Sequence, residues 1–257
     1  MKTSTLGFIG GGRITKIFLQ AFRKKSIAFD STVVYEPNKQ VASALLAQFP
    51  DITIADSPKE PARKELIFLA VHPPVMLETL TNIKEVVDPE SVVISLAPKF
   101  AIEIMAGQLP TKNIVRMIPN ATSCINKGYN PVCFHNSISD DGKENLFKIF
   151  RKLGQTFEVE ESMLEGYAMI SAMLPTYFWF QWKKMEEIAG KMGFEEAEAR
   201  KVISNTLKKS MKLYYKSTLT PEEVMDLIPV KPIGEHEDQI REIFDNKILG
   251  LYQKIKP

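Results

Sequence analysis

Residues 6–18, LGFIGGGRITKIF, decide the fold of this chain. A short apolar run ends in three glycines, and apolar side chains then recur at helical spacing as far as Phe22. Gly10, Gly12 and Thr15 make a G-x-G-x-x-T version of the dinucleotide fingerprint. Gly10 permits the tight turn, and Gly12 lets the backbone approach a pyrophosphate at the positive end of the helix. The stretch therefore predicts a strand, a phosphate-binding turn and a helix.

Outward from this stretch, apolar and β-branched runs of strand length alternate with helix-length segments. The runs occupy residues 31–36, 52–54, 66–71, 92–96, 114–118, 131–134 and 156–159. Continuous apolar runs indicate strands that are buried on both faces, and helix-length connections indicate right-handed crossovers. We therefore predict an α/β protein with a doubly wound, mostly parallel sheet over residues 1–158.

Residues 159–257 predict a second domain that is entirely helical. The segment 168–189 is unusually rich in methionine and aromatic side chains. A helix that is apolar around most of its girth is normally buried, either in a large core or in a subunit interface. A second helix is predicted over 195–215, and Thr220 with Pro221 predicts the start of a third.

Composition excludes several classes of protein. The chain has 257 residues, of which 44% are hydrophobic, and a formal charge of +2, so we expect neither disorder nor a nucleic-acid partner. Cys124 and Cys133, with three scattered histidines, are too few for a disulfide framework or a zinc centre, and we expect no metal. The amino terminus lacks a signal-peptide pattern, and no apolar run is long enough to span a bilayer. We expect a cytoplasmic protein without a membrane partner.

Glu36, at the end of the second predicted strand, stands where an acidic residue accepts hydrogen bonds from the adenosine ribose. A carboxylate there repels a 2′-phosphate, which favours NAD over NADP. Asn38 and Lys39 lie just beyond and are able to hold a phosphate if Glu36 turns away. The residues leave the choice between NADP and NAD open.

A family resemblance is carried by five segments that cover nearly the whole chain in order. They are LGFIGGGRIT (6–15), ELIFLAVHPPVM (65–76), SVVISLAPKFAIEIM (91–105), NIVRMIPNATSCINKG (113–128) and KLGQTFEVEESMLEGYAMISAMLPTYFW (152–179). These segments resemble the pyrroline-5-carboxylate reductases. The resemblance implies a Rossmann domain followed by a helical domain that forms a homodimer through its C-terminal helices. It also implies that NADPH or NADH reduces a cyclic imine, 1-pyrroline-5-carboxylate, to proline.

The same resemblance implies which residues contact the cofactor. On the pyrophosphate loop it places Gly10, Gly12, Arg13 and Ile14, and at the ribose Glu36. Along the cofactor it places Ala70, Val71, His72 and Pro73, and near the nicotinamide Ala97 and Asn120. His72 stands where the family has lysine.

The segment 231–236, KPIGEH, departs from the family pattern. The family has Ser-Pro-Gly-Gly-Thr-Thr there, a loop that cradles the substrate carboxylate, and its hydroxyls are missing here. We hypothesise that Lys231 pairs with a substrate carboxylate and that His236 donates a proton near neutral pH. The acidic neighbours Glu235 and Glu237 count against simple binding of an anion.

Three interpretations of function follow from these observations. The first is an NAD(P)H-dependent oxidoreductase that reduces 1-pyrroline-5-carboxylate. The second is a reductase of the same fold whose substrate is another imine or a carbonyl compound, which the altered 231–236 segment favours. The third is a nicotinamide-binding sensor protein without turnover, since a fold by itself does not determine function.

Overall fold

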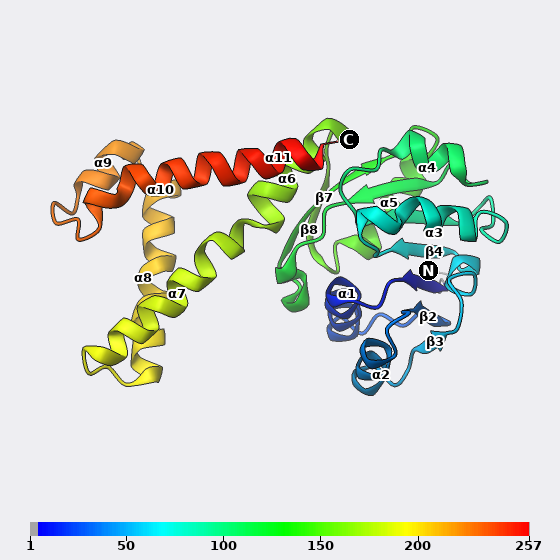
Figure 1. Ribbon diagram of the computed structural model, residues 1–257, viewed down its shortest axis with the longest axis horizontal. Helices are drawn as coiled ribbons and strands as arrows, with labels where there is room; N and C mark the ends of the chain where they lie inside the picture. The colour runs from blue at the N-terminus through cyan, green and yellow to red at the C-terminus, as the bar shows by residue number, and fades with distance from the viewer. Residues whose placement is uncertain (1–4, 257) are drawn as a thin grey trace. The chain divides into compact units, whose positions relative to one another are not determined.

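The computed structural model describes residues 5–256, and its first part is a single eight-stranded sheet (Figure 1). The strand order is β3-β2-β1-β4-β5-β6-β7-β8. The strands are β1 (Leu6–Ile9), β2 (Thr32–Tyr35), β3 (Thr53–Ala55), β4 (Leu66–Leu69), β5 (Val92–Ser95), β6 (Ile114–Met117), β7 (Gly128–Phe134) and β8 (Gly154–Glu158). The first six are parallel, with the chain reversing its direction of travel across the sheet between β3 and β4. This arrangement confirms the predicted doubly wound α/β fold, and each predicted strand is present.

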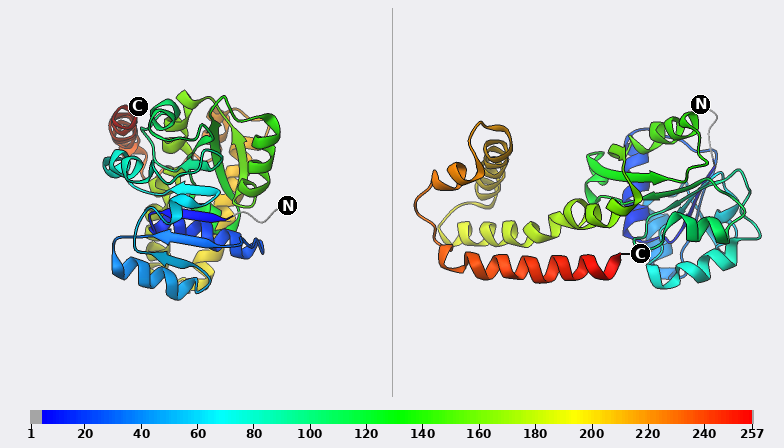
Figure 2. Two further views of the ribbon diagram at one scale, coloured as in Figure 1. Left: turned by 90° about the vertical axis from the view of Figure 1, so that its right-hand side faces the viewer. Right: turned by 90° about the horizontal axis from the view of Figure 1, so that it is seen from above.

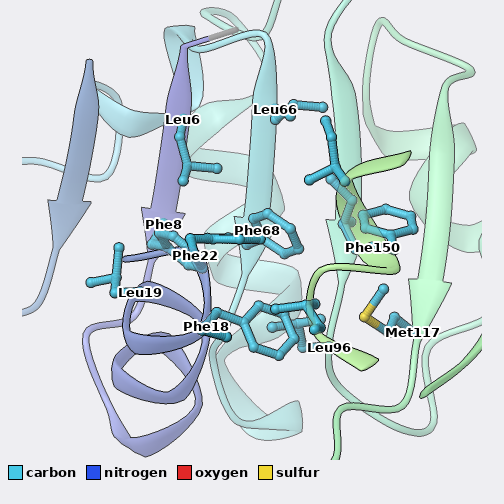
Figure 3. Packing of buried hydrophobic residues seen from close by; sticks show 14 of the residues in the cluster. Leu6, Phe8, Phe18, Leu19, Phe22, Leu66, Phe68, Leu96, Met117 and Phe150 are labelled. Atoms are coloured by element: carbon cyan, nitrogen blue, oxygen red, sulfur yellow. The ribbon is translucent and has the colours of Figure 1, made fainter. Parts of the chain in front are cut away.

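Helices cover both faces of the sheet. They are α1 (Arg13–Lys24), α2 (Lys39–Gln48), α3 (Met76–Ile83), α4 (Ile102–Gln108) and α5 (Asp140–Phe150). The face that carries Phe8 and Phe68 packs against α1, α2 and α5, and Figure 3 shows these stacked rings with Phe18 set edge-on to Phe68. The opposite face, with Ile9 and Leu69, packs against α3 and α4. Burial on both sides explains why the strands are apolar runs rather than alternating patterns.

The seventh strand departs from the parallel arrangement. β7 pairs antiparallel with β6, and β8 returns parallel to β7. The connection between β6 and β7 contains only a short 3-10 helix, Ala121–Ile125, whereas a parallel pair needs a crossover of about a dozen residues or more. The chain therefore turns back on itself at this point.

The contacts divide the described chain into two compact units, residues 5–172 with 252–256, and residues 173–251. Residues 159–172, which the sequence assigns to the helical domain, therefore pack with the sheet: Leu164 and Ala168 form a small core with Ile118. The predicted domain boundary at residue 158 stays a prediction, because the limits of a compact unit need not coincide with the limits of a domain.

The second unit is helical, and Figure 2 shows its helices from two further directions. Its helices are α7 (Leu174–Lys191), α8 (Glu196–Lys216), α9 (Pro221–Asp226) and α10 (Glu237–Phe244). A π-helical turn links α10 to α11 (Gly250–Ile255), most of which belongs to the first unit. Thr220 caps α9 as predicted, and the Glu223 carboxylate accepts the Thr220 backbone N–H in a full capping box. In residues 5–256 no helix is both long and apolar enough to cross a membrane.

Only the beginning of the apolar segment predicted over 168–189 is buried within the chain, at Ala168 and Met169. Its first part is a π-helical turn, Ala168–Ala172, and its second part is α7, none of whose described side chains is buried. Phe180 is 67% exposed and Trp179 is 46% exposed. The side chains of α7 are therefore not buried in the core of this chain, and a subunit interface for α7 stays a prediction.

Candidate functional site

The fingerprint glycines form the turn between β1 and α1. Gly10 has a φ of 103°, and a Cβ at this position would lie 2.4 Å from the Ala70 carbonyl oxygen, so only glycine fits. At Gly12, by contrast, no described atom outside this glycine and its two chain neighbours lies within 4 Å of where a Cβ would be. The buried Thr15 hydroxyl donates to the Gly10 carbonyl at 2.6 Å. The Thr15 hydroxyl and the Ala70 carbonyl therefore fix the turn where it faces the sheet, and the turn is open above Gly12. A pyrophosphate requires this shape.

The amino-terminal end of α1 favours an anion. No side chain caps it, and its first turn carries no acidic residue. The exposed side chains of Arg13 and Lys16 stand beside it and, with Gly11, Gly12 and His72, line a cleft of about 570 Å³. The partial positive charge of the helix end and two cations act together on this cleft. Lys16 is absent from the predicted set because the fingerprint leaves its position unspecified.

Glu36 follows β2 and lies directly against this turn. Its Oε2 accepts the Gly11 backbone N–H at 2.9 Å, and its Oε1 accepts the Asn38 backbone N–H at 2.9 Å. A Cβ at Gly11 would lie 2.8 Å from the Glu36 Cβ, so this glycine also permits a close approach. Lys39 and Asp56 join Glu36 in lining a second cleft of about 460 Å³. The sequence did not single out Gly11, because the second position of the fingerprint accepts any residue.

The segment after β4 borders the first cleft. Ala70 and His72 line it, and His72 is exposed. Pro73 begins a short 3-10 helix, Pro73–Val75, for which His72 is the N-cap residue. Val71, between them, is partly buried against the core on the α3 and α4 face. The resemblance placed all four residues along the cofactor, and the structure brings Ala70 and His72 to the cleft.

The turn after β5 contains a residue in an uncommon conformation. Ala97 is buried at the end of the strand, and two positions later Lys99 has a φ of 79°. A left-handed conformation is costly for a side chain of this size. The Lys99 backbone N–H donates to the Glu165 carboxylate at 3.0 Å, a contact that holds the turn in place.

Asn120, after β6, is held by protein groups at both ends of its side chain. Its Nδ2 donates to the carbonyl and to the hydroxyl of Ser171, both at 3.2 Å. Its Oδ1 accepts the Thr122 backbone N–H at 3.0 Å and the Thr122 hydroxyl at 2.6 Å. Asn120 therefore positions the chain that follows β6. Its predicted place near the nicotinamide stays a prediction.

A buried charge cluster supports the turn after β5, and sequence reasoning missed it. Arg116 on β6 donates to Glu161 at 2.9 Å and to Glu165, and Glu161 also accepts the Ile102 backbone N–H at 2.8 Å. Arg116 is 1% exposed. The signal was present in the sequence, because an arginine inside an apolar strand needs a buried acidic partner.

Cys133 lies beside this cluster, opposite Arg116 in the β6–β7 register. The pKa of its thiol is raised from 9.0 to about 11, chiefly by burial and in smaller part by the Glu161 carboxylate, while Arg116 opposes the change. The thiol is therefore protonated at neutral pH and is a poor nucleophile.

Lys231 and His236 belong to the second unit, whereas the predicted cofactor residues belong to the first. They lie on one tight turn, in which the Gly234 backbone N–H donates to the Lys231 carbonyl at 2.9 Å. His236 is exposed, and its Nε2 lies 3.4 Å from the Glu235 carboxylate. The structure thus brings the two residues to one turn, and their part in binding a substrate stays a prediction.

The first unit fits a dinucleotide. The open space above Gly12 leaves room for a pyrophosphate, and the uncapped end of α1 offers partial positive charge to it. The fixed Glu36 carboxylate is an acceptor for ribose hydroxyls. A side chain at position 12 would fill the space for the pyrophosphate. Gly10, Gly12, Arg13, Ile14 and Glu36 are accordingly the residues that would hold the cofactor.

Comparisons with known proteins show which families the chain is similar to. Residues 5–99 match a family model described as "NADP oxidoreductase coenzyme F420-dependent". A pyrroline-5-carboxylate reductase of Escherichia coli is 26% identical over 226 residues, which cover 87% of this chain and 84% of that protein. One from Methanosarcina acetivorans is 22% identical over 270 residues, covering 100% of this chain and 98% of that protein.

Solved structures resemble the fold over nearly its whole length. A pyrroline carboxylate reductase of Plasmodium falciparum, with NADP bound, has a TM-score of 0.76 at 21% identity, covering 99% of this chain and 95% of that one. A 1-pyrroline-5-carboxylate reductase of Streptococcus pyogenes has a TM-score of 0.73 at 15% identity, covering 98% and 94%. At these identities, the structural likeness is one of fold.

Proposed function

Since this chain is a divergent relative of the pyrroline-5-carboxylate reductase family, we propose that it is an NAD(P)H-dependent oxidoreductase that reduces 1-pyrroline-5-carboxylate to proline. One observation carries the proposal: the turn at Gly10 and Gly12 is open above the uncapped end of α1, beside Glu36, in a chain that aligns with these reductases over most of its length. A non-catalytic sensor and a reductase of another substrate find no comparable support.

The residues of the first unit bind and orient the cofactor. The backbone of the glycine turn and the positive end of α1 hold the pyrophosphate, while Arg13 and Lys16 add charge from its flank. Glu36 accepts the ribose hydroxyls. When bound, the reduced nicotinamide supplies the hydride that the carbon of the C=N bond receives. The protein contributes orientation, which removes much of the entropic barrier to that transfer.

The substrate residues are Lys231 and His236 in this proposal. Protonation of the imine nitrogen makes the C=N carbon electrophilic, and an imidazole is a common general acid for such a proton transfer. The Lys231 ammonium group pairs with the substrate carboxylate. The family's hydroxyl-bearing residues are replaced on this turn. In this proposal, Lys231 and His236 therefore contact the substrate where the hydroxyls do so in the family.

The chain acts as a homodimer in this proposal. The exposed aromatic side chains of α7, with Phe180 and Trp179 foremost, form an apolar surface of the kind that a subunit interface covers. A cytoplasmic location is part of the same proposal and agrees with two cysteines that are both free.

The test is nicotinamide oxidation by the purified full-length protein with 1-pyrroline-5-carboxylate. We expect turnover, a kcat lowered on the order of 100-fold by His236→Ala, and a KM raised by Lys231→Ala. Glu144→Gln, an exposed carboxylate on α5, is the matched control and should leave turnover unchanged. No turnover by a protein that still binds the cofactor would overturn the proposed reaction. Unchanged turnover in His236→Ala would remove that residue from the mechanism.

A further inference from the structure

We propose that this protein selects NAD(H) over NADP(H), and that Glu36 is the residue that sets the selection. The inference deepens the proposed function by naming the cofactor, but it depends only on nicotinamide binding and not on the substrate. The matching family model and the Plasmodium falciparum structure are both described with NADP, so this selection would distinguish the chain from them.

The first step is that the Glu36 carboxylate is fixed. Two backbone donors hold its two oxygens: Gly11 N–H on the phosphate-binding turn and Asn38 N–H at the start of α2, each at 2.9 Å. For Glu36 to turn away from the ribose position, both hydrogen bonds must break. Hydrogen bonds to a charged acceptor are stronger than neutral ones, so the fixed position is favoured.

The second step is that the fixed carboxylate still has acceptor capacity. An ionised carboxylate offers about four lone-pair positions, of which the two backbone donors occupy two. The remaining positions match the two hydroxyl donors of an unmodified ribose. A 2′-phosphate replaces one of these donors with a group that only accepts and carries about two negative charges.

The third step is that the neighbouring donors are already in use. A phosphate at this position would be held by the amino-terminal end of α2, but the Asn38 Oδ1 accepts the backbone N–H groups of Gln40 at 3.0 Å and Val41 at 3.2 Å. The helix end is therefore capped by its own side chain. This cap removes the backbone alternative that would accommodate a phosphate.

The fourth step concerns the charges that line the second cleft. Glu36 and Asp56 are acidic there, and Lys39 is the single basic residue among the described residues that line it. One lysine does not neutralise two carboxylates, so the cleft has a net negative charge before any ligand enters. A doubly charged 2′-phosphate is repelled from it, whereas a neutral ribose is not.

The experiment measures cofactor binding without any imine. Full-length wild-type protein, Glu36→Gln and Asp30→Asn are titrated with NAD⁺ and with NADP⁺, and dissociation constants are taken from calorimetry or from shifts in Tm. Asp30 is exposed in the loop before β2, so its variant makes the same change of charge at the far end of the strand. Competition by AMP and by 2′,5′-ADP on the wild type reports on the same selection without a variant.

The expected result is that the wild type and Asp30→Asn bind NAD⁺ at least about tenfold more tightly than NADP⁺, and that Glu36→Gln loses this ratio. Wild-type protein that binds NADP⁺ as tightly as NAD⁺, or 2′,5′-ADP as tightly as AMP, would overturn the proposal. An unchanged ratio in Glu36→Gln would overturn the role of Glu36. Selective binding of NAD⁺ by a protein that reduces no imine would contradict the proposed reaction while leaving this inference intact.

Discussion

Arg116 on β6 and Glu165 on α6 (Leu164–Tyr167) form a buried ion pair across 49 positions of sequence, with side chains that are 1% and 2% exposed. Glu165 also accepts the Lys99 backbone N–H, so the same carboxylate fixes the turn after β5. The Arg116 Nε has no hydrogen-bond partner among the described residues. The hydrogen bonds of the buried guanidinium group are therefore those to the Glu161 and Glu165 carboxylates. The pair therefore ties the sheet to the turn that carries Ala97.

Arg116→Met should lower the free energy of unfolding by about 3–5 kcal/mol, because it leaves the buried Glu165 carboxylate without a counter-charge. Urea unfolding followed by circular dichroism measures this change. Arg151→Met is the matched control: it breaks an exposed pair with Glu144 and should cost about 1 kcal/mol or less. Equal losses in the two variants would contradict the importance of burial.

Gly12→Ala should separate binding from stability. The position has an ordinary φ of −71° and open space where the methyl group would stand, so the free energy of unfolding should change by less than about 1 kcal/mol. The methyl group occupies the approach to the pyrophosphate, so the dissociation constant for NAD⁺ should rise about tenfold or more. Gly107→Ala, on α4 with open space around it, should leave the dissociation constant for NAD⁺ unchanged and raise the free energy of unfolding by no more than about 1 kcal/mol.

Gly10→Ala should behave differently. Its positive φ and the 2.4 Å approach to the Ala70 carbonyl oxygen mean that the turn must move, so both stability and cofactor binding should fall. A melting temperature in Gly10→Ala equal to that of the wild type would show that the turn tolerates a side chain.

Cys133 should make stability depend on pH in the alkaline range. Its pKa is about 11 in the folded protein against 9.0 in an exposed thiol, so the folded state binds the proton more tightly. The resulting stabilisation is complete below about pH 9 and is lost as pH rises towards 11. Between about pH 8 and pH 10.5, the stability of the wild type relative to Cys133→Ala should fall by about 1–2 kcal/mol. Cys124→Ala, compared in the same way, controls for the loss of a thiol, and a constant difference would contradict the raised pKa of Cys133.

Phe180→Glu should convert the proposed dimer to a monomer, because it puts a charge in the middle of the exposed apolar surface of α7. Light scattering coupled to size-exclusion chromatography measures the mass. Ile104→Glu makes a similar change at an exposed position on α4 of the first unit and should leave the mass unchanged. A wild-type protein that is monomeric at micromolar concentration would remove the basis of this prediction.

Much of the fold could be predicted because its signals are local. The apolar runs at 66–71 and 92–96 are strands β4 and β5, and the capping box at Thr220 starts α9. The antiparallel course of β7 could not be predicted with the same ease, since strand direction depends on the path of the connection and not on the residues of the strand. The candidate site divides in the same way: Gly10 and Gly12 follow from a fingerprint, whereas Gly11 and Lys16 do not.

The sequence by itself determined the positions of the strands, the phosphate-binding turn and the kind of ligand that the turn accepts, because residues close together in the chain carry each of these. Only the tertiary structure decided how Glu36 is held by Gly11 N–H, and how Arg116 finds Glu161 and Glu165. These contacts join residues that are 25 to 49 positions apart. Their energies depend on burial and distance, which no local pattern records, and folding alone brings the partners together.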